Sequence, residues 1–230
     1  MPPGFPRILP LGDSGVTVEF GDSIAPAIND QVIAFAQGLD TLTIPGVVDV
    51  APTYRSVSVY FDPLLIDPDT LERRLKELAA NLPQKPTGTG RTIEIPVAYG
   101  VDLGPDLADV ARLAGVSEQE VVALHRSMDY RVYMLGFSPG FPYLGTVPAT
   151  IAIPRLAEPR TKVPAGSVGI AGTQTGIYPQ ESPGGWRLIG RTPVKLYDPH
   201  GSTPFLFAPG DHVRFVEISY EEYWRMAGCE

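Results

Sequence analysis

Cationic and large aromatic side chains are concentrated between residues 131 and 198 of this 230-residue chain. This stretch carries seven Lys and Arg against three Asp and Glu, a net charge of +4. The whole chain has a net charge of −8, so the remainder carries −12. Arg binds carboxylates and phosphates through a planar fork, and Lys binds them as a point charge. The combination predicts a pocket for a small anion rather than a face for nucleic acid.

The candidate binding residues are polar or cationic and lie between turn residues that would hold them at a rim. The expected anion ligands are the cations Arg160, Lys162 and Arg191. Hydrogen bonds to an amide or hydroxyl are expected from Gln174, Tyr178 and Ser182. We expect Arg155 and Arg187 to be solvated.

A second group of residues is predicted to form the wall of this pocket or of an interface with a partner. Its members are Phe137, Phe141, Tyr143, Gly184, Gly185 and Trp186. Each has a structural alternative, because glycines form tight corners in small barrels and large aromatic residues fill cores. Flexible glycine backbone also permits an anion-binding nest of N–H groups.

Several motifs for catalysis are missing or incomplete. There is neither a GxxxxGK[ST] nor a GxGxxG phosphate loop. His125, His200 and His212 have no Cys or carboxylate at ligand spacing, so no metal site is predicted. Residues 136–140 match G-x-S-x-G, but Pro142 follows where a nucleophile elbow needs a helix. We therefore do not expect Ser138 to be a nucleophile.

Turn residues decide the structure of the C-terminal part. Residues 136–204 contain 11 Gly and 11 Pro, which excludes an amphipathic helix there. Short apolar runs between the turns are typical of barrel or sandwich strands. These runs are residues 168–171, 187–189, 194–197, 205–207 and 212–218.

The N-terminal part has the pattern β-α-β-β-α, followed by a linker at residues 81–90. Strands are predicted at residues 7–20, 46–51 and 54–62, with helices starting near Asp22 or Ser23 and at Asp67. Residues 91–97 either complete a ferredoxin-like βαββαβ domain or begin the second domain, and the linker favours the latter. We predict a ferredoxin-like α+β domain at residues 1–90 and a mainly-β barrel at residues 91–230.

Composition limits the classes of partner. The calculated pI of about 4.9 argues against nucleic acid and anionic membrane as partners. No apolar run is long enough to span a membrane, and no signal peptide is apparent. The single cysteine, Cys229, permits no intramolecular disulfide. The cytoplasm is the default location.

Long motifs in the C-terminal part resemble the KipI/PxpB family of 5-oxoprolinase subunits, also described as allophanate hydrolase subunit 1 or carboxyltransferase subdomain C and D. They read GFSPGFPYLG, PRTKVPAGSVGIAGTQTGIYPQESPGGW and IGRTP. The resemblance implies a cyclophilin-like barrel after the ferredoxin-like domain. It also implies a larger KipA/PxpC-type partner and, with a PxpA-type subunit, an ATP-dependent 5-oxoprolinase that converts 5-oxoproline to glutamate.

ATP would then be a co-substrate, shared with the partner subunit. No general base, ATP motif or metal ligand set is visible in this chain, so we expect no activity from it alone. Relatives suggest two alternatives: an inhibitor of a sensor histidine kinase, or a subunit of a urea- or allophanate-processing hydrolase. A prolyl isomerase would rest on the fold alone, which does not imply function.

Overall fold

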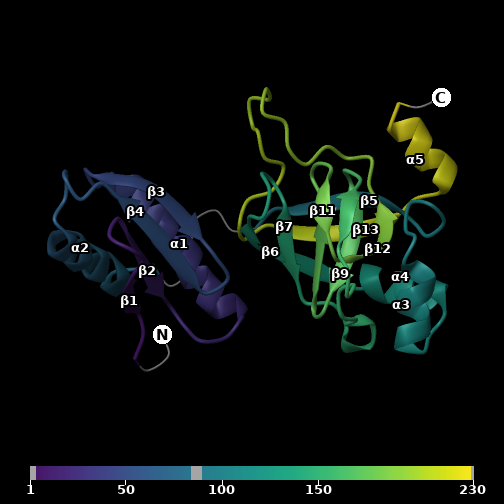
Figure 1. Ribbon diagram of the computed structural model, residues 1–230, viewed down its shortest axis with the longest axis horizontal. Coiled ribbons are helices and arrows are strands. Elements are labelled where there is room, and N and C mark those ends of the chain that lie inside the picture. Colours follow the sequence, from purple (N-terminus) through teal and green to yellow (C-terminus); the bar gives the residue numbers. More distant parts are fainter. Residues whose placement is uncertain (1–3, 84–89, 229–230) are drawn as a thin grey trace. The chain divides into compact units, whose positions relative to one another are not determined.

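The computed structural model of the protein describes residues 4–83 and 90–228. Its contacts divide the chain into two compact units, residues 1–89 and 90–230. Figure 1 shows the first unit as a small sheet with two helices and the second as a barrel with shorter helices. None of the helices in the described ranges is long and apolar enough to cross a membrane.

The first unit is an antiparallel sheet with two helices. Its strands are β1 (Arg7–Pro10), β2 (Gly15–Glu19), β3 (Val47–Pro52) and β4 (Ser56–Phe61), in the spatial order β1-β2-β4-β3. The helices are α1 (Pro26–Leu42) and α2 (Pro68–Ala80). One face of each helix and alternate strand residues form a single apolar core that includes Phe20, Phe35 and Leu75.

The predicted βαββαβ order of a ferredoxin-like domain is not observed in residues 4–83. The order is ββαββα, because the stretch expected to be one strand turns at residues 11–14 and forms the hairpin of β1 and β2. β1 therefore lies beside β2, at the sheet edge where a sixth element would be needed. The alternative in which residues 91–97 begin the second unit is correct, since β5 (Thr92–Tyr99) belongs to the barrel.

The two helix starts illustrate how local signals compete. Asp67 caps α2 as predicted, with its carboxylate accepting a hydrogen bond from the Thr70 N–H at 3.0 Å. α1 begins later than predicted, with Ala25 as the N-cap and Pro26 in the first turn. Proline suits this position because its missing N–H would be unpaired there in any case.

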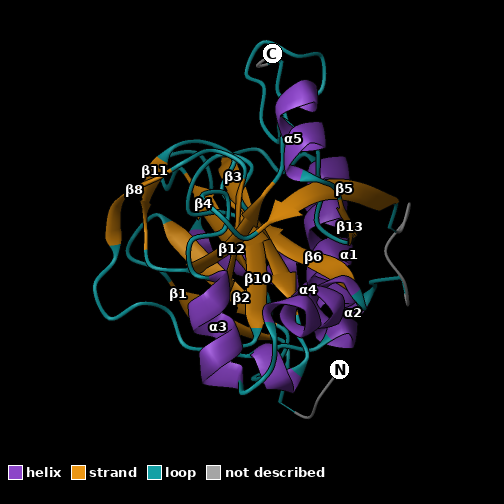
Figure 2. Cartoon of the chain, turned by 90° about the vertical axis from the view of Figure 1, so that its right-hand side faces the viewer, coloured by secondary structure: helices purple, strands orange, loops and turns teal. Residues whose placement is uncertain are grey.

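The second unit is a closed seven-stranded barrel in the order β10-β7-β6-β13-β5-β12-β9 (Figure 2). The remaining barrel strands are β6 (Asp129–Leu135), β7 (Pro142–Gly145), β9 (Ser167–Ala171), β10 (Gln174–Ile177), β12 (Arg187–Arg191) and β13 (His212–Glu217). β13 lies between β5, to which it is parallel, and β6, to which it is antiparallel. The predicted barrel is thus confirmed as a closed sheet.

Shorter elements accompany the barrel. They are the helices α3 (Leu107–Ala114), α4 (Glu118–Arg126) and α5 (Tyr220–Met226), the 3-10 turn η1 (Ala149–Ile151) and the strands β8 (Arg160–Val163) and β11 (Ser182–Gly184). β8 and β11 pair only with each other and form a separate two-stranded sheet, here called the flap. The predicted strands at 194–197 and 205–207 are wrong. Prolines 193, 199 and 204 interrupt that segment, which keeps only a bridge between Tyr197 and Phe205.

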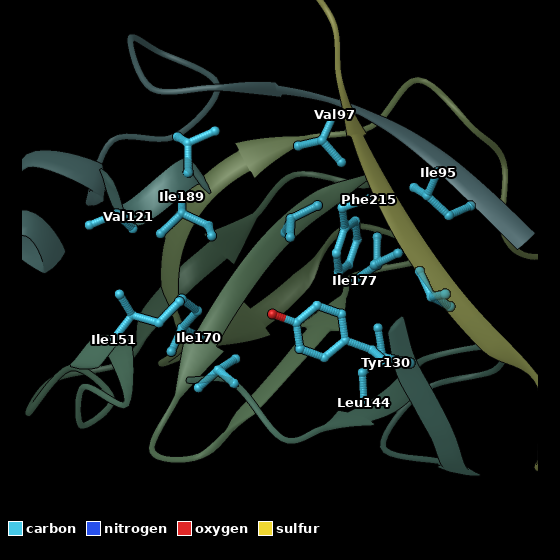
Figure 3. Packing of buried hydrophobic residues seen from close by; sticks show 14 of the residues in the cluster. Ile95, Val97, Val121, Tyr130, Leu144, Ile151, Ile170, Ile177, Ile189 and Phe215 are labelled. Carbon is cyan, nitrogen blue, oxygen red and sulfur yellow. The ribbon is translucent and has the colours of Figure 1, made fainter. Parts of the chain in front are cut away.

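Apolar side chains fill the barrel interior, among them Tyr130, Ile170, Ile177 and Phe215 (Figure 3). One titratable group lies among them. His125 of α4 is fully buried and stacks on Phe215 at a centroid distance of 4.5 Å. Its Nδ1 lies 2.9 Å from the Tyr99 hydroxyl, and its Nε2 lies 2.9 Å from the Thr175 hydroxyl.

The hydrogen bonds around His125 form one directed chain. The Thr175 hydroxyl donates its only proton to the Gly169 carbonyl at 3.0 Å, so it accepts a proton from Nε2–H. Nδ1 is then unprotonated and accepts from Tyr99. Burial lowers the pKa of His125 to about 3, which keeps the imidazole neutral. This histidine is a satisfied core residue.

Candidate functional site

The candidate site is an aromatic pocket on the outer face of the barrel, over β9 and β10. Alternation along these strands turns Val168, Ile170 and Ile177 into the core and leaves Gly169 and Gly176 on the outside. The two glycines are cross-strand partners and form a flat floor. A Cβ at Gly176 would lie 3.0 Å from ring atoms of both Phe141 and Trp186. The glycines therefore allow aromatic rings to pack directly on the sheet.

The walls of the pocket are aromatic rings that meet edge to face. Phe141 is the central ring, with centroid distances of 5.0 Å to Tyr143, 5.2 Å to Tyr178 and 5.4 Å to Trp186. These rings, with Val163 and Leu188, form an apolar cluster separate from the barrel core. The hollow between them has a volume of about 320 Å³. That size lies at the lower end of the range for small-molecule sites.

The flap forms one side of the pocket and is held by close contacts. A Cβ at Gly184 would lie 2.3 Å from the Tyr178 hydroxyl oxygen, so only glycine fits there. The Asp106 carboxylate, before α3, accepts from Arg160 Nη2 at 2.6 Å and from the Leu188 N–H at 2.7 Å. This buried carboxylate joins the flap strand β8 to the barrel strand β12.

Arg155 is the cation of this pocket. A hydrogen bond of 2.8 Å from the Leu156 N–H to the Gly185 carbonyl holds its loop against the flap. Arg155 is exposed and lines the pocket, and its guanidinium has no hydrogen-bond, ion-pair or ring partner among the described residues. Every other Lys and Arg between residues 90 and 228 has such a partner. An unpaired guanidinium beside aromatic walls suits a ligand with a carboxylate.

The three cations expected to bind an anion are engaged within the chain. Arg160 pairs with Asp106, and Lys162 pairs with Glu181 across 3.0 Å on the surface. Arg191 donates from Nε to the Ala165 carbonyl at 2.7 Å, and its guanidinium lies 6.0 Å from the Tyr223 ring centroid. None of the three lines the aromatic pocket.

The expected hydrogen-bonding residues are dispersed. Tyr178 lines the pocket, whereas Gln174 pairs with Ala171 at one end of β9 and Arg191 pairs with Ser167 at the other. Four residue steps along a strand separate those ends by about 13 Å. A single small ligand therefore cannot contact the backbone positions of both Gln174 and Arg191. Ser182 starts β11 opposite Val163.

The structure brings the six expected wall residues together in one pocket. Phe137, Phe141, Tyr143, Gly184, Gly185 and Trp186 all line it. Sequence reasoning missed Arg155, Pro159 and Pro183, which complete the lining. No spacing rule distinguishes Arg155 from a solvated cation. Its distinguishing property is the absence of a carboxylate partner, and this depends on the fold.

The polar atoms around the pocket are incompletely satisfied. The buried atoms Ser138 Oγ, Ser182 Oγ and Arg160 Nη1 have no hydrogen-bond partner in the structure. Burial raises the pKa of both Tyr143 and Tyr178, so both phenols stay protonated at neutral pH. The lining residues include no histidine or carboxylate. The pocket can hold an anionic ring but contains no group for proton abstraction near neutral pH.

The remaining motif signals do not form a catalytic centre. Ser138 is followed by β7, not by the helix of a nucleophile elbow. Across residues 4–83 and 90–228, no group of three or more His, Cys, Asp and Glu is placed to hold a metal ion.

The fold and the pocket define a class of protein in which a small α/β unit accompanies a closed barrel with a concave aromatic site. A family model described as "Carboxyltransferase domain, subdomain C and D" matches residues 6–207. The chain belongs to this carboxyltransferase-domain family.

Curated relatives agree with the family match. The chain is 41% identical to a 5-oxoprolinase subunit of Bacillus subtilis, over 94% of this chain and 95% of the relative. It is 45% identical to the 5-oxoprolinase subunit of the same name from Escherichia coli, over 90% and 93%. A urea amidolyase of Saccharomyces cerevisiae is 28% identical over 94% of this chain but only 13% of its own length.

Solved structures show the same fold. TTHA0988 superposes with a TM-score of 0.82 at 44% identity over 89% of this chain, which spans 40% of that longer chain. The conserved uncharacterized protein PH0987 of Pyrococcus horikoshii is 47% identical over 95% of this chain and its own full length, with a TM-score of 0.57. The Kluyveromyces lactis urea carboxylase, 20% identical with a TM-score of 0.75, shares the fold over 96% of this chain and 23% of its own.

Proposed function

We propose that this protein is one subunit of an ATP-dependent 5-oxoprolinase, acting with a KipA/PxpC-type and a PxpA-type subunit in the cytoplasm. Relatives named as 5-oxoprolinase subunits, similar over nearly their whole length, support the subunit role. The structural observation that carries the proposal is the unpaired Arg155 beside an aromatic pocket.

The substrate has two parts that this pocket complements. The methylene face of the five-membered lactam packs on Phe141 and Trp186, where apolar area leaves water. The carboxylate accepts hydrogen bonds from the Arg155 guanidinium in a bidentate geometry. The lactam group then points toward the open side of the pocket, where a partner subunit reaches it.

ATP drives an otherwise slow lactam hydrolysis. The lactam oxygen attacks the γ-phosphorus of ATP and ADP leaves, which makes the lactam carbon electrophilic. Water then adds to that carbon, the C–N bond breaks, and phosphate departs to leave glutamate. The developing charge needs cationic or N–H donors, and proton transfer needs a base. Since this pocket has no such base, a partner supplies it, and this chain alone is inactive.

The residues first expected to bind anions take separate duties in this proposal. Arg160 holds the flap through Asp106. Lys162 and Arg191 meet the same short turn, because Arg191 binds the carbonyl of Ala165, three residues after Lys162. This turn is our candidate contact for phosphate oxygens, with Ser182 nearby on the paired strand. Gln174, at the far end of β10, is assigned to the partner interface.

The test is reconstitution of the three-subunit complex and an assay of ATP-dependent conversion of 5-oxoproline to glutamate. Arg155→Gln is expected to raise the KM for 5-oxoproline at least tenfold, about 1.4 kcal/mol. Arg155→Lys, which keeps the charge but loses the fork, is expected to show a smaller increase. The control is Arg74→Gln in α2, which removes an exposed cation of the first unit that also has no partner among the described residues.

Each outcome of this assay has a defined meaning. Glutamate formed only by the full set of subunits supports the proposal. A stable complex that makes no glutamate but turns over urea or allophanate supports the alternative suggested by the urea amidolyase relatives. Wild-type KM in Arg155→Gln would contradict the placement of the substrate carboxylate. Failure to form any complex would favour the kinase-inhibitor alternative.

A further inference from the structure

We propose that Phe137 is a specificity-determining residue that closes the mouth of the aromatic pocket and sets the ring size that the pocket accepts. The inference deepens the proposed function and rests on it, because it takes the ligand to be a cyclic carboxylate. It concerns discrimination between ligands, which neither Arg155 nor the glycine floor explains.

The first observation is the backbone at Phe137. Its φ is +61°, a region that a non-glycine residue with a large side chain seldom adopts. The Ser138 N–H donates to the Gly136 carbonyl at 2.7 Å across Phe137. An i→i+2 hydrogen bond around a positive φ defines the rarer, strained form of the γ-turn. Strained conformations of this kind concentrate at binding sites.

The next turn fixes this conformation. The Phe141 N–H donates to the Ser138 carbonyl at 3.0 Å, and Gly140 has a φ of +80°. Proline and glycine at the two central positions are typical of a type II turn. The Gly136 N–H also donates to the Phe141 carbonyl at 3.1 Å. Two consecutive turns thus leave the loop little freedom and hold the Phe137 ring in one direction.

The second observation is where that ring lies. Phe137 is 63% exposed, although it lines the pocket. It meets Phe141 and Tyr178 edge to face, at centroid distances of 5.6 and 6.4 Å. The other face of the loop forms a separate shallow hollow with Phe205. Phe137 is therefore the ridge between two hollows, and its ring is available to cover a ligand in the aromatic pocket.

These observations define how Phe137 discriminates. A five-membered ring whose carboxylate binds Arg155 fits between the Trp186 wall and the Phe137 ring. A six-membered ring held by the same carboxylate meets Phe137, because the loop cannot move aside without breaking its turns. Removing the phenyl ring enlarges the mouth, weakens the binding of the smaller ligand and relieves the clash with the larger one.

The experiment measures ligand binding rather than turnover. The chain has two tryptophans, Trp186 in the pocket and Trp224 in α5. In a Trp224→Phe background, Trp186 fluorescence reports binding to the full-length chain. The two probes are 5-oxoproline and 6-oxopiperidine-2-carboxylate, its six-membered homologue. We expect the reference protein to bind the five-membered ring at least fivefold more tightly, and Phe137→Ala to bring the two dissociation constants within twofold.

Two further variants separate this role from simple misfolding. Phe137→Gly removes the ring and the strained non-glycine φ together, so it should melt no earlier than the reference protein and still lose discrimination. Phe205→Ala removes an exposed ring on the other side of the same loop, outside the pocket, and should keep the fivefold preference. Unchanged discrimination in both Phe137 variants would overturn the inference. Binding of neither probe by the reference protein would instead contradict the proposed substrate site.

Discussion

The interior of the barrel and its outer aromatic face have similar side chains but treat their polar groups in opposite ways. Inside, His125 uses both ring nitrogens, and Thr175 passes its proton to a backbone carbonyl. Outside, Ser182 Oγ and Arg160 Nη1 have no partner, and Arg155 is unpaired. A buried polar group without a partner lowers stability. The difference indicates that the interior is organised for stability and the outer face for binding.

The largest expected effect tests the interior network. His125→Leu removes both hydrogen bonds and leaves the buried Tyr99 hydroxyl without its partner. We expect a loss of about 2–4 kcal/mol in the free energy of unfolding, measured by chemical denaturation. The exposed His200→Leu is the control and should change stability by less than about 0.5 kcal/mol.

A second variant sharpens this test. Tyr99→Phe combined with His125→Leu removes both partners of one hydrogen bond, so part of the lost stability should return. A double variant as unstable as the sum of the single variants would mean that the network is not coupled.

Acid should destabilise the protein through the same histidine. The pKa of His125 is about 3 in the folded state, below its usual 6.5, because burial disfavours the cation. The contribution is fully present above pH 6.5 and is lost as the pH falls toward 3, by about 1.4 kcal/mol per pH unit. Near pH 5 we expect a loss of about 2 kcal/mol relative to the Tyr99→Phe/His125→Leu variant. Parallel stability curves for the two proteins would contradict this prediction.

The floor of the outer pocket should tolerate little added volume. Gly176→Ala places a methyl group 3.0 Å from Phe141 and Trp186, so the rings must shift. We expect a loss of about 1–2 kcal/mol in stability and weaker 5-oxoproline binding by Trp186 fluorescence. Gly172→Ala is not a suitable control, since Gly172 has a positive φ. Gly201→Ala is, because its nearest neighbours lie 3.5 Å away or more.

The smallest expected effect compares two hydroxyls directly. Ser182→Ala removes an oxygen that is buried without a partner, so stability should change by less than about 0.5 kcal/mol or increase. Thr175→Val removes a hydroxyl that makes two hydrogen bonds inside the barrel, and should cost about 1–3 kcal/mol. Equal losses in the two variants would remove the contrast between the two regions.

Much of the local structure could be predicted from the sequence because its signals are local. The alternation at residues 54–62 indicated β4, and Asp67 followed by Pro68 marked the start of α2. The hairpin at residues 11–14 was missed because the apolar pattern continues across it. The order of strands in the first unit then followed from that turn.

The site could be predicted only in part. Aromatic and glycine residues of the pocket lie within one Gly/Pro-rich stretch, so composition alone indicated them. The roles of the cations depend on partners distant in sequence. Arg160 is paired with Asp106, 54 residues earlier, and nothing near Arg155 in the sequence shows that it would have no partner.

The position of β13 has a consequence for how the protein is made. His212 of β13 pairs with Thr92 of β5 and with Arg131 of β6, so the last strand of the barrel separates two strands synthesised much earlier. During translation both neighbours wait with open edges until residues 212–217 have left the ribosome. A chain shortened to the residues of the family match would end at residue 207 and lack this closing strand. Such a fragment would retain every pocket residue and would still be expected to aggregate through its unpaired edges.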